Sequence, residues 1–241
     1  MKYFKQFVRW FLEHTLLPFL RYIAWGISEA FPTRTVLQEL AVKTARDCAD
    51  FVCAEMPKAL EFSKREFLWD YALKRKAGSG LMAEFGVWNG YSINYFAKKS
   101  DQLVYGFDSF IGLQEDCSGW EFAKGHFDRG GVLPQVVKNV RLVKGWVQDT
   151  LPPFLAEHKE KCSFLHVDTD TYEAAVTILQ LLEDRIHEGT IIVFDEYIGY
   201  RGWRHGEHKA FMEFVQRTQI GFEYLGFSTL AVAVQVTRCP H

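Results

Sequence analysis

The chain has 241 residues, of which 48% are hydrophobic and 24% charged, and its net charge is −2. This composition is typical of a globular protein with one main core, and the length leaves little room for two full domains. A charge so close to zero gives no general attraction to nucleic acid, so we expect no nucleic-acid partner. The five cysteines include no C-x-x-C pair, which favours a reducing, cytoplasmic location.

Residues 2–27 predict an amphipathic helix bent at Pro18. Apolar residues recur at roughly helical spacing from Phe4 to Ile27, with basic residues among them. Charged residues interrupt every window long enough to span a bilayer, so we expect neither a transmembrane helix nor a signal peptide. Three partners stay open for this helix: its own domain, a second copy in a homodimer, or the inner face of the membrane through a peripheral contact.

Two further helices are predicted before the first strand. Thr35-Val-Leu-Gln38 and Ser63-Lys-Arg-Glu66 both have capping-box spacing and precede apolar residues at helical intervals. We therefore expect residues 1–77 to be an N-terminal helical appendage and residues 78–241 to be a cofactor-binding domain.

The stretch from Leu81 to Ala97 predicts a ligand cradle. Leu81–Phe85 reads as a buried strand, residues 86–90 as a glycine turn and Ser92 as the opening of a helix. Free N–H groups at a helix start favour an anionic or carboxylate-bearing ligand, and glycines allow its close approach. We place the cofactor on Glu84, Gly86, Asn89, Gly90, Tyr91 and Ser92. A plain strand-to-helix turn is the alternative.

The spacing of this turn departs from the dinucleotide fingerprint. Gly86-Val-Trp-Asn-Gly90 is G-x-x-x-G, and bulky Trp88 stands where a pyrophosphate binder has glycine. Glu84, two residues before the first glycine, could meet an ammonium group. An amino-acid-like cofactor end therefore fits better than a pyrophosphate.

A second strand, Leu103–Phe107, ends in Asp108 and Ser109. An acid at the tip of the strand beside a glycine turn is placed to hold a ribose diol. Asp108 is therefore our predicted ribose ligand, with Ser109 beside it, and a turn cap is the alternative.

Later strands bring further carboxylates to the same edge of the predicted sheet. Ser163–Val167 ends in Asp168 with Asp170 close behind, and Gly189–Phe194 ends in Asp195 and Glu196. These negatively charged carboxylates would repel one another unless a hard cation binds between them, and carboxylate oxygens are ligands that suit Mg²⁺. Independent helix caps are the alternative.

Three other segments complete the expected chain. Residues 109–133 form a long loop rich in glycine and aromatic residues, which is typical of a lid. Arg141–Lys144 predicts the third strand, with residues 145–149 as its exit loop and Thr150 as the cap of the next helix. The last two strands, at 222–225 and 230–236, predict an antiparallel hairpin.

Four motifs in this order resemble those of the macrocin O-methyltransferase family. They are Ala83-Glu-Phe-Gly-Val-Trp-Asn-Gly-Tyr-Ser92, Gly106-Phe-Asp-Ser-Phe-Ile-Gly-Leu113, His166-Val-Asp-Thr-Asp-Thr-Tyr-Glu173 and Val193-Phe-Asp-Glu-Tyr197. The first motif and Gln148-Asp149 are also similar to catechol O-methyltransferase.

The resemblance implies an α/β, Rossmann-like class I methyltransferase fold, with a seven-stranded, mostly parallel sheet that ends in an antiparallel hairpin. It implies S-adenosylmethionine as cofactor, with its adenine near Trp146, Val147 and Gln148 and its contacts extending to Asp168. It also implies a divalent cation, expected to be Mg²⁺, on Asp168, Asp195 and Glu196. Glu196 departs from the Asp or Asn that close relatives often have.

The expected activity is methylation of a hydroxyl on a sugar, a glycan or a small natural product. Thr171 stands where the catechol enzyme has its catalytic lysine, so the catalytic candidates are Asp168 and Asp170 with His205 and His208. The alternatives are a nucleotide-cofactor oxidoreductase and a non-catalytic module, bound to a membrane or a partner, that keeps a degenerate cleft.

Overall fold

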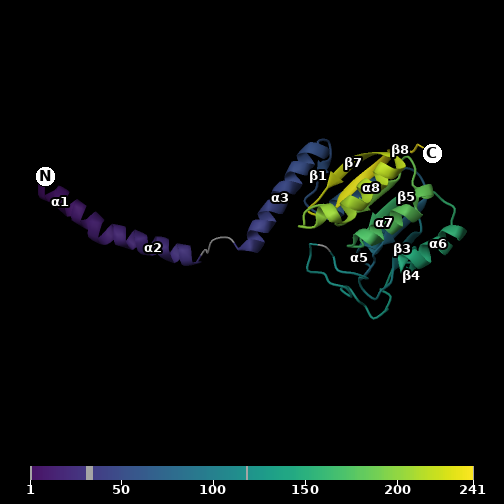
Figure 1. Cartoon of the computed structure of the whole chain (residues 1–241), viewed down its shortest axis with the longest axis horizontal. Helices are drawn as coiled ribbons and strands as arrows, with labels where there is room; N and C mark the ends of the chain where they lie inside the picture. Colours follow the sequence, from purple (N-terminus) through teal and green to yellow (C-terminus); the bar gives the residue numbers. More distant parts are fainter. Residues whose placement is uncertain (1, 31–34, 118, 241) are drawn as a thin grey trace. The chain divides into compact units, whose positions relative to one another are not determined.

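The computed structural model describes residues 2–30, 35–117 and 119–240. The chain divides into two compact units, Met1–Lys43 and Thr44–His241, and the second contains the whole sheet (Figure 1). This second unit begins before the expected boundary at 77/78. The functional division at that boundary remains a prediction.

The N-terminal unit contains the predicted helix, with a change of helical type inside it. α1 (Lys2–Phe11) continues through the π-helix η1 (Leu12–Leu16) into α2 (Leu17–Ala30). Leu17 donates its N–H to the Leu12 carbonyl, five residues back, directly before Pro18. Proline has no N–H to give, and a wider turn beside it accommodates the interrupted ladder. The side chain of Ile27, counted in the predicted apolar face, lies outside the described residues.

Within the described residues, no helix combines the length and the apolar content needed to cross a bilayer.

One mixed sheet forms the centre of the second unit, in the order β1-β7-β8-β6-β5-β2-β3-β4. Five neighbouring strands are parallel to one another: β2 (Leu81–Phe85), β3 (Val104–Asp108), β4 (Val140–Lys144), β5 (Cys162–Val167) and β6 (Ile191–Phe194). β8 (Val232–Arg238) is antiparallel to β6 and to β7 (Gly221–Phe227), which confirms the predicted hairpin. The sheet has eight strands, not seven, because β1 (Leu60–Glu61) pairs with β7, and two residues are too short for a sequence pattern.

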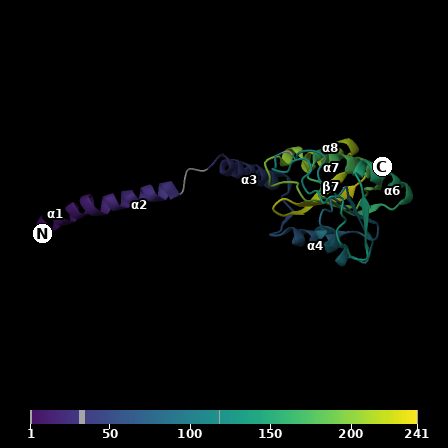
Figure 2. The same cartoon turned by 90° about the horizontal axis from the view of Figure 1, so that it is seen from below.

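Helices cover both faces of this sheet. α6 (Val147–Glu157), α7 (Tyr172–Leu181) and α8 (Glu207–Thr218) pack on one face with the end of α3 (Val36–Glu55), and α4 (Arg65–Arg75) and α5 (Tyr91–Lys98) pack on the other. Figure 2 shows α7 and α8 on the opposite side of the sheet from α4. Alternate residues of one strand supply the two cores: Ala83 and Phe85 face the first group, whereas Met82 faces the second.

The helix after β4 begins earlier than predicted. It starts at Val147 rather than Thr150, whose hydroxyl donates to the Trp146 carbonyl 2.9 Å away. The predicted start is wrong because the segment read as an exit loop already forms the first helical turn. Val147 and Gln148 are therefore helical residues at an N-terminus, where backbone N–H groups have no partner within the helix.

The parallel strands bring their carboxyl ends to one edge. The ladder extends past the strands there: Asp168 donates its N–H to the Phe85 carbonyl at 2.8 Å, and Asp195 donates to the Val167 carbonyl at 3.0 Å. The residues that follow β2, β3, β5 and β6 consequently meet above this edge.

Candidate active site

A cavity of about 660 Å³ lies over the carboxyl ends of β2, β3, β5 and β6. Most predicted site residues line it: Gly86, Asn89, Tyr91, Ser92, Asp108, Ser109, Trp146, Val147, Gln148, Asp168, Asp170, Asp195 and Glu196. Four predicted residues are outside its described lining: Glu84, Gly90, His205 and His208. The fold thus gathers thirteen of these residues from five separate segments around one space.

The glycine turn is shaped first by the chain itself. Gly86 has a φ of +88°, and a Cβ there would come within 1.6 Å of the Asp168 carbonyl oxygen. Gly90, with a φ of +83°, closes the turn by donating its N–H to the Val87 carbonyl at 2.8 Å. Gly86 is therefore required by the approach of the β5 backbone, a reason that differs from the predicted approach of a ligand.

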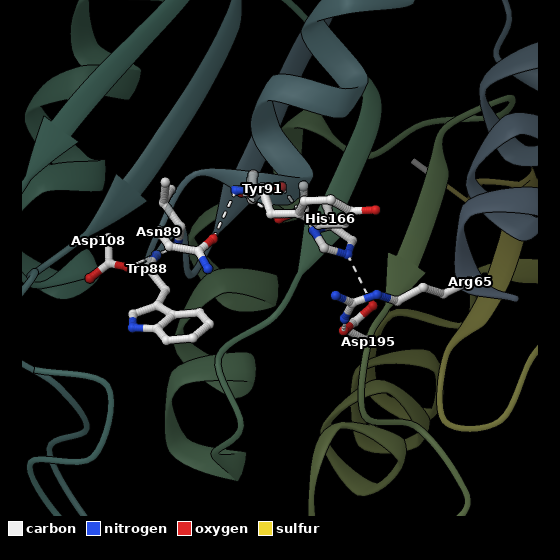
Figure 3. Close-up of polar contacts among 10 residues, drawn as sticks. Arg65, Trp88, Asn89, Tyr91, Asp108, His166 and Asp195 are labelled. Carbon is white, nitrogen blue, oxygen red and sulfur yellow. Dashed lines mark hydrogen bonds and ion pairs between the residues drawn. The ribbon is translucent and has the colours of Figure 1, made fainter. Parts of the chain in front are cut away.

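Asp108 holds the turn in place from the neighbouring strand. Its Oδ2 accepts the N–H groups of Val87 at 2.8 Å and of Trp88 at 2.7 Å, and Figure 3 shows Asp108 beside Trp88. Its Oδ1 accepts the N–H of Phe110 at 2.6 Å. An ionised carboxylate has about four acceptor positions, so these bonds leave little capacity for further donors. The structure thus realises the turn-cap alternative, while the side chain still lines the cavity. The ribose contact stays a prediction.

The start of α5 is partly capped by its own turn. Asn89 accepts the N–H of Tyr91 at its Oδ1, 3.0 Å away, and the Tyr91 hydroxyl donates to Glu66 at 2.9 Å. Ser92 is 6% exposed and donates its hydroxyl to Glu84 at 3.1 Å. One of the helix N–H groups expected to face a ligand is therefore already bonded to Asn89.

Glu84 belongs to a buried chain of charges below the cavity. Its Oε2 lies 3.0 Å from His166 Nδ1, and both side chains are fully buried. His166 Nε2 lies 3.5 Å from Asp195 Oδ1, and Arg65 donates to Asp195 Oδ2 at 2.6 Å (Figure 3). Glu84 was predicted to meet the ammonium group of a cofactor. Its carboxylate is instead enclosed by these partners and is not accessible from the cavity.

The opposite charges in this buried series of side chains stabilise one another. Burial alone disfavours a charged ring, but the carboxylates of Asp195 and Glu84 raise the pKa of His166 to about 10. Burial opposes ionisation of Asp195 too, and His166 and Arg65 nevertheless lower its pKa. His166 and Arg65 were not predicted as site residues.

A second group of carboxylates adjoins Asp195. Burial, with the nearby charge of Asp195, raises the pKa of Asp170 to about 7; burial, with Asp168, raises that of Glu196 well above its usual range. Glu207, the first residue of α8, is 1% exposed and accepts the Glu196 N–H at 3.1 Å. Sequence reasoning missed Glu207 because it reads as an ordinary acid in the first turn of a helix.

The donor atoms of this group fit a divalent cation. Ligand atoms of His166, Asp168 and Asp195 all lie within 4.8 Å of one another. Glu196 Oε2 is buried and has no hydrogen-bond partner among the described residues, and Asp195 Oδ1 has only the 3.5 Å ion pair with His166 Nε2. Buried carboxylate oxygens without a donor are costly, and an oxygen-preferring cation would satisfy them. The identity of the ligands remains a prediction.

The cavity as a whole is strongly acidic. Seven carboxylates line it, those of Asp108, Glu115, Asp168, Asp170, Glu173, Asp195 and Glu196. Among its described lining residues, Arg65 is the one arginine, lysine or histidine. Burial raises the pKa values of Asp168, Asp170 and Glu196, but even when these three keep their protons the other four carboxylates outnumber the one arginine, so the space suits a cationic ligand better than an anionic one.

The two predicted histidines lie elsewhere. His208 packs against the rings of Phe51, Tyr197 and Trp203, with centroids 5.1, 5.0 and 4.8 Å from its own. Burial, aided by the Arg204 charge, lowers its pKa to about 4. His205 is exposed in the short helix η3 (Trp203–His205). Of the four predicted catalytic residues, the cavity lining holds only Asp168 and Asp170.

We predict that His208 makes the fold sensitive to acid. In the folded protein it takes a proton near pH 4, and in the unfolded chain near 6.5, so the unfolded state binds more protons between these values. Its contribution to stability is complete above pH 6.5 and is lost as the pH falls toward 4. In urea unfolding across this window, His208→Phe should show a smaller loss of stability than the wild type. His205→Gln, at an exposed site, is the control. If the free energy of unfolding falls equally with pH in all three proteins, His208 is not the source of the acid sensitivity.

The segment predicted to be a lid lines the cavity. Between residues 109 and 133 the described lining includes Gly112, Leu113, Gln114, Glu115, Trp120, Phe122 and Phe127. The segment is braced by a bridge between Ile111 and Asp128, and Gly119 approaches Gly202 so closely that a Cβ would lie 2.4 Å from the Gly202 nitrogen. Trp120 packs on Tyr200, 5.3 Å between centroids. The lid thus rests on the loop that follows β6.

Residues 83–197, the segment that carries the turn, the lid and the acidic group, match the family of methyltransferase domains. The matched segment, rather than the whole chain, resembles a methyltransferase domain. Among solved structures, the chain is similar to the calicheamicin methyltransferase CalS11, with 21% identity, a TM-score of 0.57, and coverage of 86% of this chain and 95% of that one. The O-methyltransferase NovP is 22% identical, with a TM-score of 0.52 and coverage of 72% and 80%.

A separate apo structure of CalS11, described as a TDP-rhamnose 3'-O-methyltransferase, is 20% identical with a TM-score of 0.51. At these identities the neighbours show a shared fold. No curated protein sequence matches the chain. The domain match and the shared fold both support an S-adenosylmethionine-dependent methyltransferase, and membership of the macrocin family in particular stays a prediction.

Proposed function

We propose that the protein transfers the methyl group of S-adenosylmethionine to a hydroxyl of a sugar, a glycan or a small natural product, with help from a divalent cation. The charge of the cavity carries this proposal. S-adenosylmethionine brings a sulfonium and an ammonium group, which the excess of carboxylates over the one arginine in the lining favours. A nicotinamide or flavin dinucleotide brings a pyrophosphate, which the same lining repels.

We assign the methyl donor to three segments of the cavity lining. We assign the ribose to Asp108 and the adenine to the start of α6, at Trp146, Val147 and Gln148. The amino-acid end lies toward the turn at Gly86 and the start of α5. Glu84 has no direct role in this assignment and acts through Ser92 and His166, which it holds.

The acceptor hydroxyl is assigned to the acidic side of the cavity. Asp168, Asp195 and Glu196 would hold the cation, which supplies Lewis acidity that lowers the pKa of the hydroxyl. Asp170 lines the same space and is our candidate to receive the hydroxyl proton, since His205 and His208 lie outside it. The carbon–oxygen bond forms as the carbon–sulfur bond breaks, and the neutral thioether that remains is held less strongly by the acidic lining.

The acceptor class is supported by the fold neighbours. CalS11 is named for methylation of TDP-rhamnose, and NovP is named as an O-methyltransferase. We propose a cytoplasmic enzyme with a small-molecule or glycan acceptor. For residues 2–27, the chain's own domain, a second copy and the membrane surface remain the three candidate partners.

A ligand titration tests the proposed donor. S-adenosylhomocysteine should raise the melting temperature of the protein, by more as its concentration increases, because a ligand that binds only the folded state stabilises it. NADH should leave the melting temperature unchanged. A shift with NADH and none with S-adenosylhomocysteine would favour the oxidoreductase alternative, and no shift with either would favour the non-catalytic one.

We predict that Asp108→Ala weakens S-adenosylhomocysteine binding by about 1.5 to 3 kcal/mol, through loss of charge-assisted hydrogen bonds to the ribose and loosening of the turn. Calorimetry measures this loss. Asp128→Ala is the matched control, because Asp128 also caps a backbone N–H, that of Gly130 at 2.7 Å, and does not belong to the described cavity lining. Unchanged affinity in a folded Asp108→Ala protein would remove Asp108 from the donor site.

A further inference from the structure

The N-terminal helix exposes its apolar side chains. Within the N-terminal unit taken by itself, every residue from 8 to 23 is exposed, and the large apolar ones include Phe4 at 70%, Trp10 at 54% and Phe19 at 59%. A helix with this much uncovered apolar surface is unstable in water unless something covers it. The methyltransferase chemistry does not account for this surface.

The first part of the helix is amphipathic. Phe4, Val8 and Leu12 follow one another at four-residue intervals and form an apolar row, and the next row carries Lys5, Arg9 and Glu13. Arg9 and Glu13 form an ion pair of 2.9 Å along that row. The boundary between the two rows runs along the helix, as it does when a helix lies at the surface of a bilayer.

The second part is apolar on more than one side. Leu16, Leu17, Phe19 and Leu20 are all exposed, and they point in different directions around the helix. Pairing with one other helix needs a narrow stripe repeated every 3.5 residues on average. A broad apolar surface suits lipid chains better than a second copy of this helix.

The charge of the segment points to the kind of lipid. Residues 2–30 contain four basic residues (Lys2, Lys5, Arg9 and Arg21) and two acidic ones (Glu13 and Glu29), a net charge of +2. Because the whole chain carries −2, the remaining residues together carry −4. An anionic surface therefore attracts this segment and repels the rest of the protein.

We propose that residues 2–23 bind an anionic lipid surface, with the helix lying in the plane of the membrane. Phe4, Val8 and the apolar side chains from Leu16 to Leu20 enter the boundary between headgroups and acyl chains. Lys5 and Arg9 remain at the headgroups. This contact holds the methyltransferase unit at a membrane and does not depend on the identity of its acceptor.

Vesicle sedimentation of the full-length protein tests this proposal. The protein should bind phosphatidylcholine vesicles that contain about one-third phosphatidylglycerol, and bind pure phosphatidylcholine at least about tenfold more weakly, because polybasic attraction needs anionic lipid. Val8→Glu should abolish most of the binding. Gln6→Glu is the matched control, since it makes the same change of charge on the opposite, polar side of the helix and should weaken binding only modestly.

The result that overturns the proposal is equally concrete. Absence of binding to the anionic vesicles, equal binding to both kinds of vesicle, or equal loss in Val8→Glu and Gln6→Glu would each reject it. Light scattering without vesicles tests the alternative that a second copy covers the helix. That alternative is supported if the wild type does not bind vesicles but forms an oligomer that Val8→Glu dissociates. The melting-temperature response to S-adenosylhomocysteine should be the same in Val8→Glu as in the wild type, which separates this test from that of the proposed function.

Discussion

Gly86→Ala is expected to destabilise the protein by about 3 to 5 kcal/mol, among the largest effects of a single added methyl group. The alanine Cβ would lie 1.6 Å from the carbonyl oxygen of Asp168, and the residue would have to keep a φ of +88°. Neither the turn nor the end of β5 can move freely, because Asp168 continues the ladder with Phe85 and Asp108 holds Val87. Urea unfolding at neutral pH measures the loss.

The matched control for this change is Gly78→Ala. Gly78 also has a positive φ, +61°, but a Cβ there would meet nothing within 4 Å. The control therefore isolates the backbone strain, which we expect to cost about 1 kcal/mol. Equal losses in the two variants would contradict the close approach of the turn and Asp168.

Asp195→Asn is expected to lower turnover by about a hundredfold or more with little change in S-adenosylhomocysteine affinity. The substitution keeps the shape of the side chain and removes the charge that Arg65 and His166 share. It also removes a proposed ligand of the cation. In the wild type, EDTA should abolish turnover and added Mg²⁺ should restore it, whereas Mg²⁺ should not rescue the variant.

Glu173→Gln is the control, because Glu173 lines the same cavity and lies outside the group formed by Asp168, Asp195 and Glu196. Calorimetry with Mn²⁺ provides a readout that does not need the acceptor: the wild type and Glu173→Gln should bind the ion, and Asp195→Asn should bind it weakly. The melting temperature of each variant reports loss of folding, because removing one partner of a buried ion pair can cost about 3 to 5 kcal/mol. Full activity in EDTA would leave a methyltransferase without a metal.

The sheet could be predicted from sequence because its central strands are short apolar runs that end in acids or glycine. Leu81–Phe85 agrees with the structure, and the strands that end at Asp108, Asp168 and Asp195 were predicted within a residue or so of their observed ends. The added strand β1 could not be predicted, because its two residues form a strand only through pairing with β7.

The cavity lining could be predicted for the same reason, whereas the buried ion pairs below the cavity could not. Glu84 and His166 are register partners on adjacent strands β2 and β5, 82 residues apart in the chain. Arg65 reaches Asp195 across 130 residues. A pattern along the chain shows where an acid ends a strand, but only the order and register of the strands show which partner encloses it.

The most direct test of the account is a crystal structure with S-adenosylhomocysteine. We predict one bound molecule per chain in the cavity over the carboxyl ends of β2, β3 and β5, with its ribose at Asp108, its adenine beside Gln148 and its amino-acid end at the turn that begins with Gly86. Soaking the same crystals in Mn²⁺ should add an anomalous signal near Asp168 and Asp195. An empty cavity at saturating S-adenosylhomocysteine, or a ligand bound away from the Gly86 turn, would contradict the proposed donor site.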